Sequence, residues 1–303
     1  MNFKQLDVSD YDILKVFFKE QPYSLSIYSL ASIIAWSSRM HRPLYTISDG
    51  TLFIAGEEEN HPNDRHLILP LSSKAYPSPS ELHHFARKLG FDRYWYAPGD
   101  YLEKLDRSEL DSYFTVEEQK EFTEYVYLAE DMIRLRGNRF AKKRNLIHQF
   151  TRDYLSKDRV EVQTIRPEYT DECLKFLEIW CEQYTCDEDL ESSLACEKNA
   201  LITTLKNMDR LESKGILIRI DGEVSAFGIG SRLNRTTATL NFEKAFSEFK
   251  GLYQFLDNEC AKRLFSEFLY INKESDMNVP NLAKSKQSYN PVFRIKSYSL
   301  VLR

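Results

Sequence analysis

One segment of the chain carries a carboxylate between basic residues at the point where a strand is expected to give way to a helix. It spans residues 241–253. Its polar and conformationally special positions are Glu243, Lys244, Lys250, Gly251 and Tyr253. A glutamate at a strand end can serve as a general base if burial raises its pKa. The two lysines could neutralise a phosphate or carboxylate, and backbone amides near Gly251 could bind an anion. The alternative is a surface Glu–Lys pair beside an ordinary helix start.

A second polar segment runs from Tyr270 to Asp276 and continues through residues 282–289. Asn272 and Glu274 are two apart, and side chains alternate along a strand, so both are predicted to share one side of a strand end. Opposite charges could bring Glu274 together with Lys284 and Lys286 in one polar cleft, beside Tyr289. A capped helix with surface charges is the alternative interpretation.

The run Lys142-Lys143-Arg144-Asn145 lies in the segment 137–150, whose apolar spacing predicts a helix. Arg139, Lys142 and Lys143 fall on one face of that helix. Such a face could contact phosphate or an RNA backbone. A solvated helix face with one ion pair explains the same pattern.

Composition bounds the classes of protein that the chain can belong to. The 303 residues include 41 Lys+Arg and 46 Asp+Glu, for a net charge of −5, which excludes a wholly basic nucleic-acid-coating protein. No phosphate-loop motif, HExxH or GxSxG is present. The five cysteines lack metal-ligand spacing, so we expect buried free thiols and no metal site. No signal peptide or bilayer-spanning run is apparent, which predicts a soluble, cytoplasmic protein.

The elements that must position these residues recur in one order: two helices, a hairpin plus a third strand, a helix and a strand. Asp49-Gly50 and Asp221-Gly222 mark the two hairpins. The predicted helices span 10–20, 27–40, 79–89, 138–154, 168–184, 189–211, 251–265 and 281–288. The predicted strands span 44–48, 51–55, 67–71, 94–96, 160–165, 216–220, 223–229, 236–242, 268–271 and 292–302. The repeated order predicts an α+β fold of two tandem acetyltransferase (GNAT)-like domains, each a mixed, mainly antiparallel sheet flanked by helices. We place the domains at 1–136 and 137–303, with the active cleft in the second.

Several of these segments together resemble one family. The resemblance rests on the Lys142–Asn145 helix, on Phe242-Glu243-Lys244-Ala245, and on residues 270–276 with 285–291. The sequence is similar to the stand-alone bacterial family related to the C-terminal catalytic domain of phosphatidylglycerol lysyltransferase. In that branch the donor is an aminoacyl-tRNA and the acceptor is a lipid head group. The resemblance implies a tandem acetyltransferase-like fold.

Three departures from the family pattern stand out. Asn241 replaces a histidine, Lys273 replaces an arginine, and Pro280-Asn281-Leu282-Ala283 stands where a Gly-Leu-Arg run is usual. Lysine does not reproduce a bidentate arginine contact, so the ligand could differ or the site could have decayed. The acetyl-CoA signature is missing after Glu243, which disfavours acyl-CoA as the donor.

These observations favour an acyltransferase that moves an aminoacyl or acyl group to an amine or hydroxyl. Glu243 would take the proton, and Lys142, Lys143 and Arg144 would hold a phosphate-bearing ligand such as a tRNA acceptor end. Two alternatives remain: a non-catalytic protein that binds an anionic ligand, and a CoA-dependent N-acetyltransferase. The sequence leaves the oligomeric state open.

Overall fold

A computed structural model describes residues 2–38, 41–58, 64–72, 76–184 and 193–303. The first half of the chain contains six strands and the helices that connect them. These elements are β1 (Lys4–Gln5), α1 (Tyr11–Phe18), α2 (Leu30–Ala35), β2 (His41–Ser48), β3 (Thr51–Glu58), β4 (His66–Leu67), α3 (Pro79–Leu89), β5 (Arg93–Pro98), α4 (Gly99–Leu102), α5 (Arg107–Tyr113), β6 (Phe114–Leu128) and α6 (Ala129–Arg134).

The second half repeats the pattern. Its elements are α7 (Ala141–Asp153), β7 (Val160–Thr164), α8 (Thr170–Tyr184), α9 (Ser193–Lys206), β8 (Lys214–Ile220), β9 (Glu223–Arg232), β10 (Thr237–Ala245), α10 (Leu252–Leu264), β11 (Tyr270–Ser275), α11 (Pro280–Gln287) and β12 (Phe293–Leu302).

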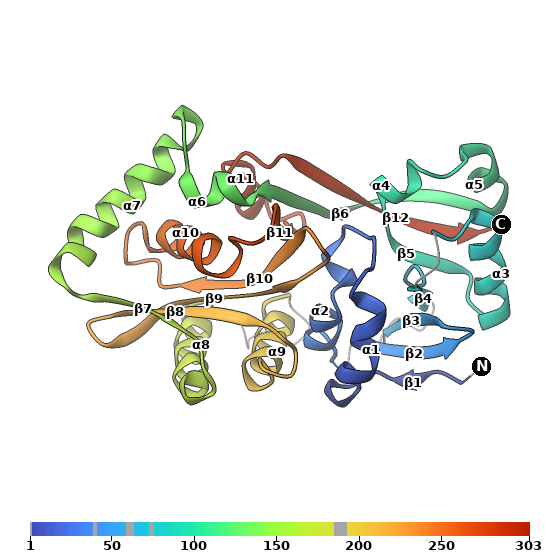
Figure 1. The fold of residues 1–303 in the computed structure, drawn as a ribbon, viewed down its shortest axis with the longest axis horizontal. Coiled ribbons are helices and arrows are strands. Elements are labelled where there is room, and N and C mark those ends of the chain that lie inside the picture. Colours follow the sequence, from blue (N-terminus) through green and yellow to red (C-terminus); the bar gives the residue numbers. More distant parts are fainter. Residues whose placement is uncertain (1, 39–40, 59–63, 73–75, 185–192) are drawn as a thin grey trace.

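All of these strands belong to one sheet, in the order β1-β2-β3-β4-β5-β12-β6-β11-β10-β9-β8-β7. Neighbouring strands are antiparallel except β4/β5 and β10/β11, which are parallel and are each joined through a helix. The parallel pair therefore occupies the same place in both halves. This duplication confirms the predicted α+β fold of two acetyltransferase-like units (Figure 1).

The two halves exchange strands where they meet. β12, at the end of the chain, pairs with β5 of the first half, and β6 pairs with β11 of the second half. β6 and β12 also pair with each other. The sheet is thus continuous across the boundary predicted at residues 136/137, and that boundary stays a prediction.

Local sequence explains the best-predicted elements. Both Asp-Gly hairpins have positive φ at both turn residues, as the tight hairpin turn requires. Helix α3 begins with a capping box between Ser78 and Glu81 and ends at Gly90, whose φ is 78°.

Other elements differ from the predictions. The fifteen-residue strand β6 was not predicted, because its first two thirds carry mostly polar residues that read as a loop. Helix α2 is shorter than predicted, and β4 pairs over only two residues. The predicted helix ends at 39–40 and 189–192 lie outside the described residues.

Helices cover both faces of the second half's sheet (Figure 1). Ile216 and Ile218 of β8 share an apolar cluster with α7 and α10, whereas Leu217 joins the cluster formed by α8 and α9. This alternation follows from the two-residue period of a strand. None of the helices formed by the described residues has the length and hydrophobicity that a bilayer crossing requires.

Each strand of the parallel pair β10/β11 has a β-bulge relative to its antiparallel neighbour, which is β9 for β10 and β6 for β11. Asn241 is an extra residue in β10, since Leu240 pairs with Gly230 and Phe242 pairs with Ile229. Strand β11 gains an extra residue between Asn272 and Ser275 relative to β6, and Glu274 within it has φ of 59°. Such bulges redirect side chains near functional sites.

Gly251 sets the approach of α10 to α7. Its φ is 91°, and a Cβ there would overlap the carbonyl oxygen of Leu146. Gly222 also has positive φ, 86°, but a Cβ there meets nothing within 4 Å.

We expect Gly251→Ala to destabilise the fold more than Gly222→Ala. Both variants bear the left-handed backbone cost of about 1–2 kcal/mol, and only Gly251→Ala adds an overpacking cost of about 1–3 kcal/mol. Urea unfolding measures the difference. Equal destabilisation would show that the contact between α7 and α10 is not tight.

Candidate active site

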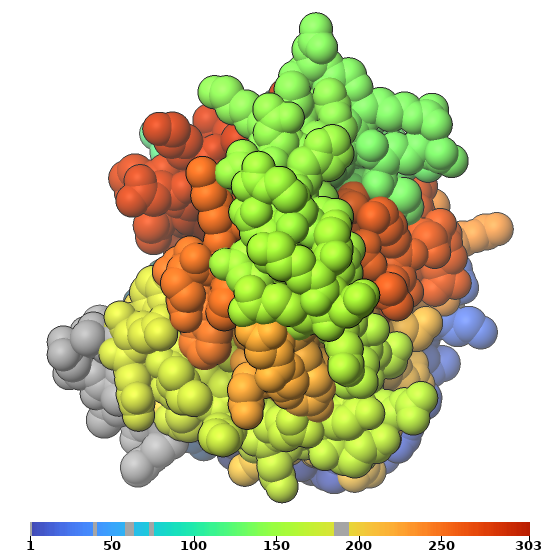
Figure 2. All heavy atoms as spheres, turned by 90° about the vertical axis from the view of Figure 1, so that its left-hand side faces the viewer, coloured from blue at the N-terminus to red at the C-terminus, as the bar shows by residue number. Residues whose placement is uncertain are grey.

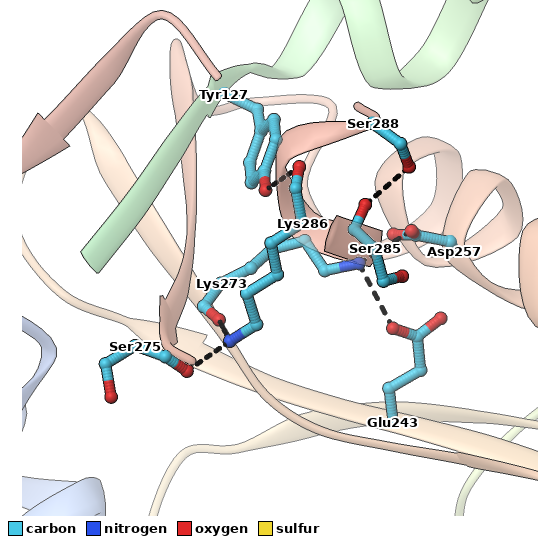
Figure 3. Close-up of polar contacts among 8 residues, drawn as sticks. All are labelled: Tyr127, Glu243, Asp257, Lys273, Ser275, Ser285, Lys286 and Ser288. Carbon is cyan, nitrogen blue, oxygen red and sulfur yellow. Dashed lines mark hydrogen bonds and ion pairs between the residues drawn. The ribbon is translucent and has the colours of Figure 1, made fainter. Parts of the chain in front are cut away.

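Three elements of the second half bring a lysine between two carboxylates. The Nζ of Lys273 on β11 lies 2.6 Å from Oδ2 of Asp257 on α10 and 3.1 Å from Oε2 of Glu243 on β10. The side chain of Lys273 is 10% exposed and that of Asp257 is 4% exposed. Figure 3 shows the lysine reaching between the two acids. One cation therefore links β10, α10 and β11.

Strand alternation separates Glu243 from its neighbours. Phe242 packs with α8 and α9 on the opposite side of the sheet. Lys244 is also buried there, with Nζ 2.6 Å from Oε2 of Glu197 and 4.0 Å from the ring centre of Trp180. The pair predicted to act together at the turn is thus divided between the two faces of the sheet.

Helix α10 supplies Asp257 from a buried polar run. Asn258 donates to the carbonyls of Met132 and Ile133, and Glu259 pairs with Lys262 and Arg263. Of this run, Asp257 is the residue that contacts the lysine of β11. Three consecutive polar residues at buried positions of this helix are the sequence signal that could have identified the acid.

Burial controls the protonation of the cluster. Desolvation and the nearby charge of Asp257 raise the pKa of Glu243 to about 7, although Lys273 acts in the opposite direction. Desolvation lowers the pKa of Lys273, but Asp257 and Glu243 together outweigh it and raise that pKa above its ordinary value. Lys273 stays charged, and Glu243 can gain or lose a proton near neutral pH.

A second lysine closes the bulge of β11. Lys286 on α11 donates from Nζ to the backbone carbonyls of Lys273 and Ser275, at 2.5 Å each (Figure 3). Tyr127 donates to the carbonyl of Lys286 at 2.8 Å. Desolvation lowers the pKa of Lys286 and raises the pKa of Glu274. The negative charge of Glu274 acts against the first shift, and the positive charge of Lys286 acts against the second. The sequence predicted that Glu274 and Lys286 would come together. In the structure their charges interact, while Lys286 donates to backbone carbonyls of the bulge.

A buried hydrogen-bond network connects this region to the first half. Asn241 donates to Glu274 at 3.2 Å and to Ser32 of α2 at 2.9 Å. Asn272 donates to Oε2 of Glu124 on β6 at 2.5 Å. The same carboxylate accepts from the backbone N–H and the hydroxyl of Ser26. Both halves of the chain thus hold the polar end of β11 in place.

Lys143 and Tyr289 border the charged cluster. Nζ of Lys143 on α7 lies 3.6 Å from the ring centre of Tyr289, and Nζ of Lys273 lies 5.1 Å from the same centre. Tyr289 is 6% exposed, and its ring meets that of Tyr127 edge-on at 6.4 Å. Two ammonium groups thus lie near the same aromatic ring, and the charge of Lys273 lowers the pKa of Lys143.

Six of the predicted site residues lie in or beside these clusters. They are Lys143, Glu243, Asn272, Glu274, Lys286 and Tyr289. Tyr253 of α10 is half-buried, and desolvation raises its pKa to about 12.

The other predicted residues lie elsewhere. Lys142, Asn145, Lys250 and Lys284 are exposed. Arg144 donates to the carbonyls of Leu135 and Gly137 and so supports the turn before α7. Gly251 serves the packing of α7 against α10. The ligand-binding roles predicted for these residues stay predictions.

Sequence reasoning did not select Asp257, Lys273 or Glu124 as site residues. Lys273 was noticed only because it replaces an arginine of the family pattern. Its position one residue after Asn272, in a bulge, could not be anticipated because a regular strand would place it on the opposite side from Asn272. Glu124 was missed together with strand β6.

The described residues contain no group of three or more His, Cys, Asp or Glu side chains placed to hold a metal ion. Cys173 and Cys260 are buried free thiols, Cys181 is buried, and Cys196 is half-buried. Cys186 lies outside the described residues.

Comparison with solved structures defines the class of the protein. A conserved protein of unknown function from Bacteroides thetaiotaomicron matches with a TM-score of 0.88 and 24% identity over all of both chains. The C-terminal domain of a candidate lysylphosphatidylglycerol synthetase from Agrobacterium fabrum matches with a TM-score of 0.66 and 13% identity, over 96% of this chain and 91% of that one. Fold and topology make the chain a protein of two acetyltransferase-like units.

Sequence comparison then gives the family. The model of the phosphatidylglycerol lysyltransferase C-terminal family matches residues 78–301, and the chain belongs to this family. An uncharacterized protein of Mycoplasmoides gallisepticum is 23% identical over 176 residues, which cover 58% of this chain and 55% of that protein. The chain thus spans about half the length of this curated relative. Family and fold together place it in an acyltransferase superfamily.

Replacement of Glu243 by Gln tests the electrostatic description of the cluster. The folded pKa of about 7 exceeds the ordinary value of 4.5, so the wild-type glutamate loses stabilising free energy as pH rises between these values. Glutamine does not titrate. Urea unfolding should therefore show Glu243→Gln gaining stability relative to wild type from pH 5 to pH 8, by at most about 3 kcal/mol.

Glu248→Gln is the matched control, because Glu248 is exposed in the turn before α10. Its stability difference from wild type should not follow this trend. A difference for Glu243→Gln that is constant with pH would contradict the raised pKa.

Proposed function

We propose that the chain is an acyltransferase that moves an aminoacyl group from an activated ester to an amine or hydroxyl acceptor, with Glu243 as the general base. The observation that carries this proposal is Glu243, whose side chain is 17% exposed and contacts Lys273, and whose pKa of about 7 lets it accept a proton near neutral pH. Its carboxylate is oriented by Lys273, and Lys273 is oriented by Asp257.

The reaction follows from these positions. The acceptor nitrogen or oxygen attacks the carbonyl carbon of the ester, and Oε1 or Oε2 of Glu243 takes its proton. The ester C–O bond then breaks, and the leaving alkoxide takes up a proton from the protonated Glu243 or from water, which gives the alcohol. Lys273 stays charged throughout, so it limits the rise in pKa that burial imposes on Glu243. That balance keeps the base available near pH 7.

An aminoacyl-tRNA is the favoured donor. The family takes its name from a lysyltransferase. Helix α7 crosses the centre of the face in Figure 2 and carries the exposed Lys142, while the exposed Lys250 lies just before α10. Exposed cations on such a face attract a phosphate backbone. Lys143, Arg144 and the amides near Gly251 complete the proposed donor region.

A non-catalytic, anion-binding protein is the second candidate. It is favoured by the pairing of Lys273 with two carboxylates, because these acids could serve only to hold the lysine. Asn241 and Lys273, which depart from the family pattern, point in the same direction.

Glu243→Gln separates these candidates. An enzyme should lose turnover by about 10²–10⁴-fold while its affinity for the donor stays within a few-fold, because glutamine keeps the shape and loses the proton acceptor. Product formation is followed by mass spectrometry with a mixture of aminoacyl-tRNAs and candidate amine acceptors. Glu248→Gln should retain wild-type turnover. Unchanged turnover in Glu243→Gln would exclude Glu243 as the base.

Thermal shift distinguishes the donors. If the proposal holds, aminoacyl-tRNA should raise the melting temperature and acetyl-CoA should not, since only a ligand that binds the folded state stabilises it. Stabilisation by micromolar acetyl-CoA, with none by tRNA, would instead favour a CoA-dependent N-acetyltransferase.

A further inference from the structure

Four lysines of the second half lie in or beside the clusters described above, and three of them have partners. Lys244 pairs with Glu197, Lys273 with Glu243 and Asp257, and Lys286 with two backbone carbonyls. Lys143 is the fourth. Within the ranges that the structure describes, its Nζ has neither a hydrogen-bond acceptor nor an ion-pair partner, and the residue is 8% exposed.

The surroundings of Lys143 are aromatic on one side and charged on the other. Its Nζ lies 3.6 Å from the ring centre of Tyr289. The titratable groups that act on it are Asp257 of α10, Lys273 of β11 and Glu243 of β10. Desolvation outweighs the two carboxylates and lowers the pKa of Lys143 to about 8. Much more of this amine is neutral near pH 7 than of an ordinary lysine, whose pKa is about 10.4.

Solvent can still reach this amine. Among the described residues, two side-chain polar atoms are fully buried and have no hydrogen-bond partner. They are Oγ1 of Thr239 and Nδ2 of Asn290. The partnerless Nζ of Lys143 is not one of them, so it touches solvent. The unpartnered Nζ thus has contact with solvent, on a residue that is 8% exposed overall.

We propose that Lys143 is an acylation site, whose ε-amine reacts with small activated acyl compounds, namely esters and thioesters. The neutral nitrogen attacks the carbonyl carbon and forms the C–N bond of an amide, and the C–O or C–S bond of the donor breaks. The nitrogen loses one proton to a neighbouring carboxylate or water, and the leaving alkoxide or thiolate takes up one proton. No oxidant or further reactant is needed.

Acylation would change the site. The product amide carries no charge, so Tyr289 loses one of its two cations, and the group formed by Lys143, Glu243, Asp257 and Lys273 becomes more negative by the charge that Lys143 carried. Reaction of Lys143 with an activated acyl compound would thus change the charge of the candidate active site. This inference stands apart from the transferase proposal, because it needs an activated ester and no turnover.

Site-resolved acetylation of the wild-type protein tests the proposal. The folded chain is treated with p-nitrophenyl acetate in one arm and acetyl-CoA in the other, between about pH 6 and pH 10, and peptides are quantified by mass spectrometry. Near pH 7, Lys143 should gain an acetyl group at least roughly tenfold faster than its exposed neighbour Lys142, because its neutral fraction is on the order of a hundredfold above that of an ordinary lysine. Its rate should level off above about pH 8, as the pKa of about 8 requires.

Lys273 is an internal control, since its ammonium group is held by two carboxylates that raise its pKa, and it should stay unmodified. The variant Lys143→Arg keeps the charge and should lose the fast acetylation. Reaction with both reagents supports esters and thioesters alike, and reaction with the aryl ester alone limits the site to small esters. Acetylation of Lys143 no faster than that of Lys142 with both reagents, or seen only in urea, would overturn the proposal.

Discussion

The candidate site depends on one buried lysine held between two acids. Bringing an ammonium group and two carboxylates out of water costs several kcal/mol per ion, and only close pairing recovers that cost. Lys273 achieves it with contacts of 2.6 and 3.1 Å to Asp257 and Glu243. The shorter contact belongs to the more deeply buried acid. The lysine is therefore anchored by Asp257, and Glu243 is left as the acid whose proton affinity is poised near neutrality.

The same backbone irregularity occurs at corresponding positions of the two halves. In the first half, β5 has an extra residue relative to β12, and Tyr96 within it has φ of 59°, as Glu274 has in β11. Trp95 precedes Tyr96 just as Lys273 precedes Glu274. Trp95 stacks on His66 with ring centres 4.2 Å apart, and burial lowers the pKa of His66 to about 4. The same type of β-bulge thus carries a stacked aromatic side chain in the first half and a charged side chain in the second half.

The sequence was most informative where local chemistry determines structure. The Asp-Gly turns, the capping box at Ser78 and the glycine stop at Gly90 could be read directly, and together they revealed the repeat. Glu243 could be singled out because an acid at a strand end can act as a general base if burial raises its pKa. Lys244 beside it looked equivalent, but strand alternation places it with Glu197 on the other face.

What could not be predicted depends on contacts between distant segments. Asp257 and Lys273 are 16 residues apart and meet only because β11 lies parallel to β10 beneath α10. Glu124 and Asn272 are 148 residues apart and meet through the pairing of β6 with β11. No periodicity within a single segment reports such pairings. Strand β6 itself was not predicted, because most of its residues are polar.

The exchange of strands gives the first half a part in the site although its own copy carries no ions there. β6 lies beside β11 and delivers Glu124 to Asn272, whose side-chain oxygen in turn accepts from the N–H of Glu274 at 2.8 Å. Ser26 satisfies the remaining acceptor positions of Glu124 from the segment before α2. A buried carboxylate with so many donors is fixed in position, and it fixes the bulge that carries Lys273 and Glu274. The geometry of the charged cluster is therefore a property of the continuous sheet, because neither half alone contains all the residues that hold β11 in its bulged form.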